Sequence, residues 1–479
     1  MIDSTPFAAV PTAPVATERQ PLLRVIADAL RGVETDLTEA PLGRALVMLA
    51  VPMILEMIME SIFAIVDVFW VAHLGPEAVA TVGLTESMMM IVYSLAMGTA
   101  IGAMALVSRR VGEKRLDDAA RTATQGIYLA ALLAIAIGVA GALYAPELLS
   151  LMGASASVVK TGARFTSIML GGNIIVFLLF VINSVFRGAG DAARAMRVLW
   201  LGNALNIALG PLFIFGIGPF PKMGVAGAAL ATTLGRGIAV LYQLSILRSG
   251  KGKLAISRSH LGFDAALIGK VIKLSTSATG QMLISMTSYI GVMRILSRFG
   301  SAPLAGYTIG FRIFMFAILP AFGLANAAAT LVGQNLGAKR ADRAEASVWR
   351  ASHVSAAFLC SIGAVFLIAA PALVGLFTSD PEVSRYGVDY LRIVSLGVPF
   401  YAYGMVVSQS FNGAGDTRTP TLINLGVFWV LQIPLAELLS QHTRLSVHGV
   451  FITLAASFSV FAVVSVLAFR RGAWKRAHV

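Results

Sequence analysis

Phe-Arg-Gly-Ala-Gly-Asp at residues 186–191 and Phe-Asn-Gly-Ala-Gly-Asp at residues 411–416 are two copies of one pattern, 225 positions apart. The same offset, applied without a gap, pairs glycines throughout the chain: Gly75 with Gly300, Gly112 with Gly337, Gly172 with Gly397, and Gly224 with Gly449. The chain is therefore an internal duplication. A duplication of this length predicts two equivalent structural units.

The composition places both units in a membrane. Hydrophobic residues make up 57% of the chain, only 13% is charged, and the mean hydropathy is +0.80, far from the balance of soluble domains. The net charge of +13 comes from basic residues in short gaps between apolar segments rather than on one soluble face, which argues against nucleic-acid binding. The single Cys360 lies in an apolar segment, so neither a disulfide framework nor a cysteine metal site is expected.

A membrane-spanning helix needs about 20 mostly apolar residues. That window predicts six helices in the first half, at residues 45–72, 79–107, 123–144, 159–186, 196–216 and 224–247. Adding 225 predicts most of the six helices in the second half, at residues 270–297, 304–332, 347–369, 383–411, 419–440 and 449–470. We therefore expect an all-α integral membrane fold with twelve transmembrane helices in two homologous six-helix bundles.

The segments outside these helices define the expected domain limits. We expect a cytoplasmic N-terminal tail at 1–44 with an amphipathic stretch from Leu22 to Val33, bundles at 45–247 and 270–470, a basic linker at 248–269, and a cytoplasmic tail at 471–479.

Lysine and arginine are distributed unequally between alternate gaps. The gaps on one side hold 23 and those on the other hold 6, which predicts that the first side, with both termini, is cytoplasmic. Six helices per half make both halves enter from the same side, so the repeats are parallel and related by an axis along the membrane normal. Repeated halves of this kind are typical of carriers, whose substrate site lies between them.

The first predicted helix carries Glu56, Glu60 and Asp67 inside an apolar run. At about 100° per residue the three carboxylates share one face and climb it over about 16 Å. Ionisable residues at this depth usually face a cavity and mark ion or proton paths. The offset maps them to Gln281, Ser285 and Val292, so the acids are confined to one repeat and the symmetry of the scaffold does not explain them.

Two interpretations of these acids remain open. Glu56 could be interfacial, or one acid could pair with Arg294 or Arg312 on a facing helix. Alternatively, a buried carboxylate exchanges a proton at physiological pH, and an organic cation competes with that proton for the same negative charge. That competition would produce antiport.

Other polar residues are secondary candidates. The polar residues expected to complete a substrate cavity are Glu86, Asn173, Asn203, Asn206 and Gln281, although asparagine often only bonds between helices. The repeated motif supplies structural turns at Gly188, Gly190 and Asp191, and at Gly413, Gly415 and Asp416. No phosphate loop, hydrolase motif or paired metal-ligand spacing occurs, so we expect neither an enzyme nor a metal or organic cofactor.

The chain resembles the multidrug and toxic compound extrusion (MATE) family from about residue 40 to 470. The resemblance lies in the twelve helices, Val66-Asp67 followed by Val71-Ala72-His73-Leu74-Gly75, the segment from Val332 to Arg340, and the doubled Gly-Ala-Gly-Asp. It implies a V-shaped pair of bundles that exports organic cations or amphipathic compounds in exchange for protons or sodium. It also implies a coupling role for Asp67.

Two positions depart from family patterns. The segment from Leu205 to Pro211 is similar to the Asn-x-x-Leu-Asp-Pro element of the DinF-like branch, to which the chain looks closer, but Gly210 stands where the aspartate would be. Ser285 stands where the sodium-coupled NorM-like branch has a glutamate, which weakens a sodium interpretation. Since 285 minus 225 is 60, we hypothesise that Glu60 replaces the missing acid.

We therefore predict a monomeric antiporter in a bacterial inner membrane that exports small organic cations or amphipathic drugs by alternating access, in exchange for protons or for sodium, with protons as the first choice. The alternative is a flippase for a lipid-linked sugar or metabolite, in which Arg164, Arg294 and Arg312 would meet phosphates. A membrane-embedded enzyme or a channel fits less well, because no catalytic constellation occurs and a channel has no need of two equivalent halves.

Overall fold

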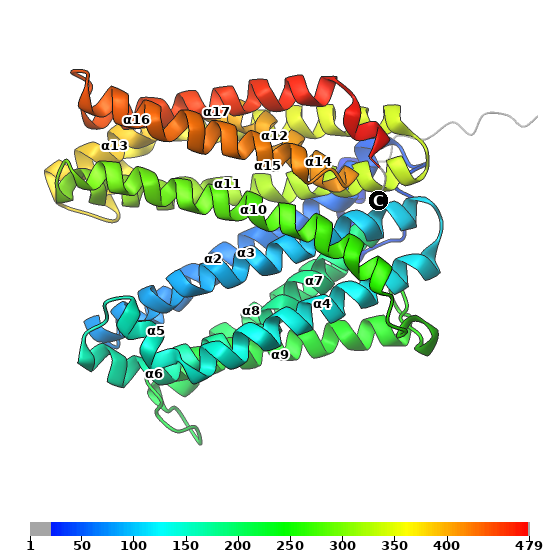
Figure 1. Cartoon of the computed structure of the whole chain (residues 1–479), viewed down its shortest axis with the longest axis horizontal. Coiled ribbons are helices and arrows are strands. Elements are labelled where there is room, and N and C mark those ends of the chain that lie inside the picture. Colours follow the sequence, from blue (N-terminus) through cyan, green and yellow to red (C-terminus); the bar gives the residue numbers. More distant parts are fainter. Residues whose placement is uncertain (1–20, 478–479) are drawn as a thin grey trace, which may run out of the picture.

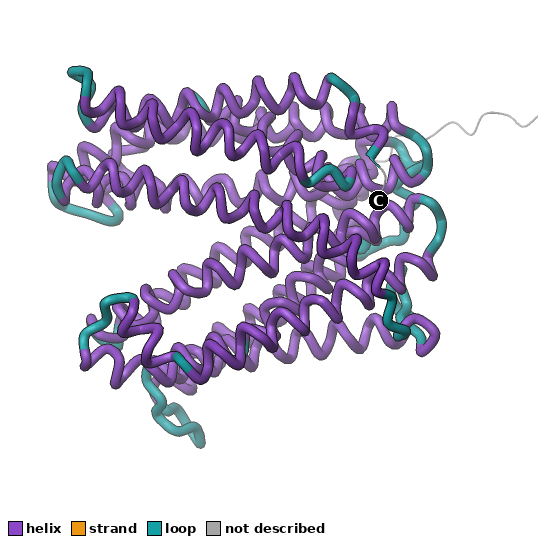
Figure 2. Tube along the Cα trace, in the orientation of Figure 1, coloured by secondary structure: helices purple, strands orange, loops and turns teal. Residues whose placement is uncertain are grey.

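The computed structural model describes residues 21–477, and every regular element in that part of the chain is a helix (Figure 2). The short α1 (Leu22–Arg31) precedes the first repeat. The first repeat, called the N-half here, contains α2 (Leu42–Ala72), α3 (Pro76–Gly112), α4 (Leu116–Leu143), α5 (Ala145–Leu151), α6 (Ala156–Gly171), α7 (Asn173–Ala189), α8 (Ala192–Phe215) and α9 (Val225–Ser249).

The second repeat, called the C-half, follows a connection with one 3-10 turn, Arg258–His260. It contains α10 (Ala265–Ser297), α11 (Ser301–Gly337), α12 (Ala341–Gly375), α13 (Pro381–Ser395), α14 (Val398–Ala414), α15 (Arg418–Asn424), a π-helical segment (Leu425–Leu431), α16 (Gln432–Gln441) and α17 (Val447–Arg470). A last 3-10 turn covers Ala473–Arg476.

These elements form twelve spans when interrupted helices are joined. Within residues 21–477, ten runs are long and apolar enough to cross a membrane, and α13 with α14, bent by 61°, makes an eleventh. The twelfth is α10, which has 33 residues but is too rich in serine and threonine to meet the same apolar criterion. The predicted all-helical, two-bundle architecture is thus confirmed.

Both repeats interrupt the same span with the same residue. Gly172 separates α6 from α7, and Gly397, its partner at the 225 offset, lies between α13 and α14. A Cβ on Gly397 would lie 2.6 Å from the carbonyl oxygen of Ala455 on α17, so the neighbouring helix leaves no room for a side chain there. The breaks are therefore part of the repeat.

The two halves lie together at the end that carries the C-terminus and diverge toward the other end (Figure 1). Helix α3 packs against α10, and by the same symmetry α11 packs against α2. A Cβ on Gly98 would lie 2.1 Å from Thr279 Oγ1, and one on Gly323 would lie 2.7 Å from the nitrogen of Ile54. Both contacts are related by the 225 offset, so glycine permits the close approach of helices twice, once on each side of the axis.

The repeated motif ends a helix in each half. Gly190 and Gly415 adopt left-handed backbone angles, with φ of 84° and 87°. The amide of Gly190 donates to the carbonyl of Arg187 at 2.9 Å, and that of Gly415 donates to the carbonyl of Asn412 at 3.0 Å. These hydrogen bonds close the last turns of α7 and α14, and only glycine adopts such angles without strain.

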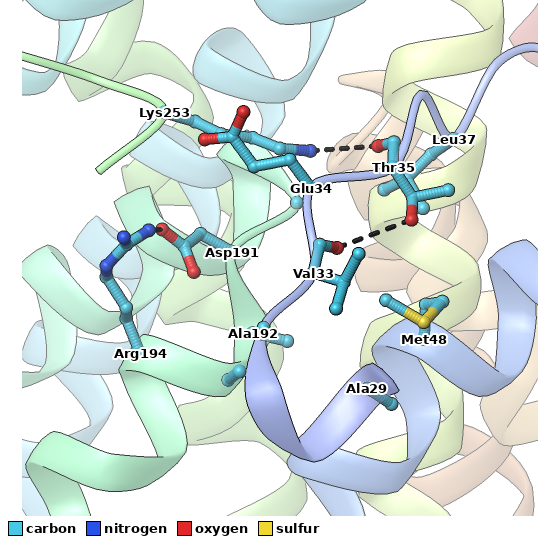
Figure 3. Close-up of a pocket in the computed structure, with 13 residues that line it drawn as sticks. Ala29, Val33, Glu34, Thr35, Leu37, Met48, Asp191, Ala192, Arg194 and Lys253 are labelled. Atoms are coloured by element: carbon cyan, nitrogen blue, oxygen red, sulfur yellow. Dashed lines mark hydrogen bonds and ion pairs between the residues drawn. The ribbon is translucent and has the colours of Figure 1, made fainter. Parts of the chain in front are cut away.

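Residues 33–40, called the N-terminal strap here, cross the closed end between the halves. Figure 3 shows Val33, Thr35 and Leu37 of the strap beside Lys253 of the inter-repeat connection, which donates to the carbonyl of Thr35 at 3.0 Å. The cavity drawn there is about 20 Å³, room for a single water.

The strap is bonded to both repeats. Lys114 of the N-half pairs with Asp36, while Arg340 of the C-half donates to the carbonyl of Thr38 at 2.7 Å. Arg343 donates to the carbonyl of Leu37 at 3.2 Å. The chain ahead of the first repeat therefore ties the two halves to one another.

Candidate functional site

The first of the three acids on α2, Glu56, is buried in the N-half with an exposed fraction of 2%. Its Oε1 accepts hydrogen bonds from Asn183 Nδ2 at 3.1 Å and from Arg187 Nη1 at 3.4 Å. Asn183 and Arg187 are four residues apart on α7, so both face α2. Gln243 of α9 donates to Asn183 Oδ1 at 2.7 Å and extends this buried network.

The C-half repeats the same network without charge. At the equivalent positions, Gln281 of α10 replaces Glu56, and its Oε1 accepts from Asn412 Nδ2 at 3.2 Å. Gln281 Nε2 donates to Ser408 Oγ, also at 3.2 Å. Since Asn412 and Ser408 correspond to Arg187 and Asn183 at the 225 offset, one arrangement is ionic in the N-half and neutral in the C-half.

Glu60 lies one turn further along α2 and has two partners of its own. Asn203 Nδ2 on α8 donates to Glu60 Oε2 at 2.9 Å, and Arg236 Nη2 on α9 donates to Glu60 Oε1, also at 2.9 Å. The Arg236 side chain is 5% exposed, and its guanidinium lies 4.8 Å from the ring centre of Phe63. A buried arginine held on both sides in this way fixes the position of Glu60.

The remaining two candidate acids of the N-half have no hydrogen-bonding or ion-pair partner among the described residues. Asp67 on α2 and Glu86 on α3 form no hydrogen bond or ion pair with the residues that the structure describes. Glu86 is exposed, and the charges of both Asp67 and Arg236 act on it. The four candidate carboxylates of the N-half thus lie on α2 and α3, and Asp67 and Glu86 are the two that form no ion pair with an arginine among the described residues.

The other predicted cavity residues are divided among different places. Asn206 donates to Thr232 Oγ1 at 2.7 Å, a bond between α8 and α9 rather than to an acid. Asn173 begins α7 beside the Gly172 break, and both polar atoms of its buried amide lack a partner among the described residues. Gln281 belongs to the C-half network described above.

The arginines that neutralise the acids differ from those expected. Arg294 and Arg312 were the possible partners expected on facing helices, and neither forms an ion pair with any described acid; Arg187 and Arg236 do. Arg187 lies in the repeated motif, at the end of the fourth predicted helix, which made it look like a loop residue. Comparison of the two repeats could have indicated Arg187 as the partner of Glu56, because both charges are absent from the second repeat, where Asn412 and Gln281 occupy the equivalent positions. The signal for Arg236 was a lone arginine inside an apolar helix.

The C-half encloses a cavity of about 270 Å³ between α10, α11, α14, the π-helical segment and α17. No charged residue is among the described residues that line it. Ten aromatic rings form most of its wall: Tyr289, Tyr307, Phe311, Phe314, Phe322, Tyr390, Tyr401, Phe428, Phe458 and Phe461. Its polar lining comes from α10, from α14 and from the two residues that flank the π-helical segment: Gln281, Ser285, Ser288, Ser408, Gln409, Asn424 and Gln432. The two halves thus differ sharply in interior chemistry.

Two repeated helical bundles that meet at one end, with acids inside one bundle and an uncharged cavity inside the other, define a membrane transporter of the carrier type. The MatE family model matches residues 52–212 and 278–438, one segment in each half, and the chain belongs to this family. Members of this family are transporters and not enzymes.

Similar proteins cover almost the whole chain. The probable multidrug resistance protein YoeA of Bacillus subtilis is 24% identical over 91% of this chain and 95% of its own length. The probable multidrug resistance protein NorM of Pseudomonas aeruginosa is 27% identical over 91% and 90%. The FAD transporter of Shewanella oneidensis is 25% identical over 84% and 89%.

Solved structures of MATE transporters have the same fold. A crystal structure of MATE in complex with MaL6 superposes with a TM-score of 0.86 and 26% identity, covering 92% of this chain and 99% of that chain. The outward-facing conformation of a multidrug resistance MATE family transporter of the MOP superfamily also gives a TM-score of 0.86, with 26% identity over 92% of this chain and 98% of that one.

Proposed function

We propose that this protein is a secondary antiporter that exports small amphipathic organic compounds, organic cations among them, across a bacterial inner membrane in exchange for protons. The names of the relatives support the direction and the broad substrate range, since YoeA and NorM are both described as probable multidrug resistance proteins. The two bundles, proposed to span 45–247 and 270–470, would rock against each other in a monomer.

The coupling proposal rests on Asp67 and Glu86, the two acids that form no ion pair with a described residue. Glu56 and Glu60 each already have an arginine, so gaining or losing a proton there would break an ion pair. Asp67 and Glu86 have no such bond to break. A proton bound to either carboxyl removes a negative charge that a cationic substrate would otherwise compensate, so proton and substrate compete.

Glu60 keeps the separate role that we hypothesised for it, as a replacement for the acid missing at residue 210. Arg236 holds Glu60 in this conformation, and a change in the distance between α2 and α9 would release it. Under this proposal Glu60 takes part in coupling only when its ion pair with Arg236 opens, while Asp67 and Glu86 bind the exchanged proton in the paired state.

The contacts between the halves support an outward-facing state. With both termini in the cytoplasm, as the distribution of basic residues predicts, the end closed by the Gly98 and Gly323 contacts is the cytoplasmic one. Alternating access then requires these contacts and those of the N-terminal strap to separate when the substrate enters from the cytoplasm.

A flippase for lipid-linked sugars is not favoured. Such a carrier would need basic side chains for phosphates, and no charged residue is found among the described residues that line the C-half cavity. The unpaired charges in the N-half interior are acidic, which would repel a phosphate.

The proposal is tested by transport of ethidium in proteoliposomes under an imposed pH or sodium gradient. We expect transport driven by the pH gradient, lost in Asp67→Asn and Glu86→Gln. It should be retained in Glu77→Gln, a matched change at an exposed acid in the first turn of α3. Transport driven only by sodium would overturn the proton proposal, and full transport in both Asp67→Asn and Glu86→Gln would overturn the assignment of the site.

The same assay tests Glu60. Glu60→Gln should alter the pH dependence of transport if Glu60 replaces the missing acid. Full transport with an unchanged pH dependence would rule that role out and leave Glu60 as a structural partner of Arg236.

A further inference from the structure

We infer that the C-half cavity is a binding site for a planar nitrogen heteroaromatic group that carries N–H donors at its edge. The inference rests on the proposed function only in taking this ligand to be a transported substrate. Its support is independent of the acids in the N-half, because it comes from the shape, the polarity and two unpartnered amide oxygens of the C-half cavity.

The walls of the cavity suit a flat ring. Tyr289 and Phe311 stack with their centres 4.5 Å apart, and Phe314 stacks on Phe458 at 5.8 Å. Aromatic side chains offer a further ring both face and edge contacts. The volume of about 270 Å³ exceeds the roughly 150 Å³ of a cavity known to admit benzene, so two or three fused rings can enter.

Asn424 presents the first unpartnered oxygen. This side chain is 4% exposed, and its Oδ1 has no hydrogen-bond partner among the described residues. Asn424 Nδ2 donates to Ser285 Oγ at 3.4 Å. The hydroxyl of Ser285 already donates to the carbonyl of Gln281 at 3.1 Å, so toward Asn424 it can only accept, and the amide must point its nitrogen at the serine.

Gln432 repeats this arrangement two turns further on. Its exposed fraction is also 4%, its Oε1 is unpartnered among the described residues, and its Nε2 donates to Ser288 Oγ at 3.1 Å. The Ser288 hydroxyl donates to the carbonyl of Phe428 at 2.8 Å, which again fixes the amide orientation. Each serine thus leaves one buried amide oxygen without a donor among the described residues, on a side chain whose residue lines the cavity.

Buried acceptors without partners are rare and costly, which points to a missing partner. The unfilled acceptors are neutral carbonyl oxygens, so the matching ligand groups are N–H or NH₂ donors rather than anions. The two residues are eight positions apart, on the order of 10 Å along a helix, so donors at opposite ends of a fused ring system could reach both.

The backbone that presents these oxygens is unusual. Asn424 and Gln432 flank the π-helical segment Leu425–Leu431, and Phe428 at its centre also lines the cavity. Segments of π-helix are rare and occur frequently at functional sites. The N-half has regular α-helix at the equivalent place in α8, where the offset replaces Asn424 with Leu199 and Gln432 with Ile207. The feature therefore belongs to one half only and does not follow from the duplication.

The test compares two dyes that share one ring system. Proflavine carries an NH₂ group at each end of an acridine, and acridine orange has the same ring with both nitrogens dimethylated. Fluorescence titration of the purified full-length protein in detergent, with no ion gradient, measures the affinity for each. We expect wild type to prefer proflavine, and Asn424→Leu and Gln432→Met each to reduce that preference roughly two- to tenfold while the affinity for acridine orange changes little.

A third variant distinguishes loss of the acceptor oxygen from collapse of the cavity. Gln432→Glu keeps an acceptor oxygen at the site, so the preference for proflavine should persist in it even if Gln432→Met binds neither dye. Equal affinities of the two dyes in wild type would overturn the proposal, as would an unchanged preference in both Asn424→Leu and Gln432→Met, or loss of the preference in Gln432→Glu.

The outcome is separable from that of the transport proposal. Asp67→Asn should abolish proton-driven uptake of tetraphenylphosphonium, which has no N–H donor, but keep the preference between the dyes. Proton-driven uptake that survives in Asp67→Asn would contradict the coupling site without touching the cavity. Equal binding of the two dyes would contradict the cavity proposal and leave the coupling site unaffected.

Discussion

Ser108 of α3 and Gly333 of α11 occupy the same position in the two repeats, and they lie directly against each other. A Cβ on Gly333 would come within 2.0 Å of Ser108 Oγ. Two equivalent residues can meet only on the axis that relates the repeats, so this contact marks where the axis passes through the closed end. The single hydroxymethyl group of Ser108 fills the space there, and glycine must face it.

We expect Gly333→Ala to weaken the closed end. The added methyl group has no room, and overpacking of this kind costs about 1–3 kcal/mol. The midpoint of thermal unfolding in detergent should fall, and ethidium transport should fall with it. Gly83→Ala is the matched control, because Gly83 lies in the same helix as Ser108 and a Cβ there meets nothing within 4 Å. An equal effect of both changes would show that the contact at the axis is unimportant.

The neutral network of the C-half predicts how the ionic one can be replaced. Arg187→Asn alone leaves Glu56 buried without its arginine, and breaking a buried pair costs about 3–5 kcal/mol. Arg187→Asn combined with Glu56→Gln recreates the pairing of Asn412 with Gln281, so most of the lost stability should return. Thermal unfolding of the two single variants and the double variant measures this coupling. Strictly additive losses would contradict the equivalence of the two networks.

The pair formed by Asp36 and Lys114 predicts a pH dependence at the N-terminal strap. Burial of the Asp36 carboxyl tends to raise its pKa, but hydrogen bonds from Lys114 and Thr38 outweigh burial and lower the pKa from 3.8 to about 2. A lowered pKa means that the folded state prefers the ionised form. The stabilisation is therefore present above about pH 4 and disappears as the pH falls toward 2.

The measurement compares unfolding midpoints of wild type and Asp36→Asn across this range. We expect a small difference near neutral pH, on the order of 1 kcal/mol or less because the pair is partly exposed, and a difference that vanishes as the pH approaches 2. Lys114→Met should lose the same stabilisation over the same window. A difference that does not change with pH would show that the charge of Asp36 contributes nothing.

Gly415 should tolerate substitution poorly for a different reason. Its φ of 87° lies in the left-handed region, where a side chain costs roughly 1–2 kcal/mol. Gly415→Ala should therefore lower the unfolding midpoint. Gly269→Ala should not, because Gly269 lies in regular α10 with nothing near the added Cβ. Equal stability of the two variants would contradict the backbone argument.

The fold was predictable from the sequence because the duplication identified a membrane span that hydropathy alone does not identify. Taken alone, α10 is too polar to be identified as a membrane span. The 225 offset nevertheless identifies it as the counterpart of the strongly apolar α2. The interruptions at Gly172 and Gly397 were not anticipated. A helix break of this sort depends on the approach of another helix, which hydropathy does not report.

The site was predictable in part. The acids of α2 were evident, because each carries a charge where lipid or protein must compensate it. Their partners were not, since Arg187 lies in a motif that resembles a loop and Arg236 is separated from Glu60 by 176 residues. The aromatic cavity escaped notice because its residues are individually ordinary core residues. Only the folded chain shows that they surround a space.

The N-terminal strap has a mechanical consequence for any carrier that must open at this end. Residues 33–40 are bonded to Lys114 in one repeat and to Arg340 in the other, so the two bundles cannot separate there while both anchors hold. In the alternating-access cycle proposed above, at least one of these anchors has to release whenever this end opens. A segment outside the duplicated architecture thus contributes contacts that have to be exchanged when the two halves separate.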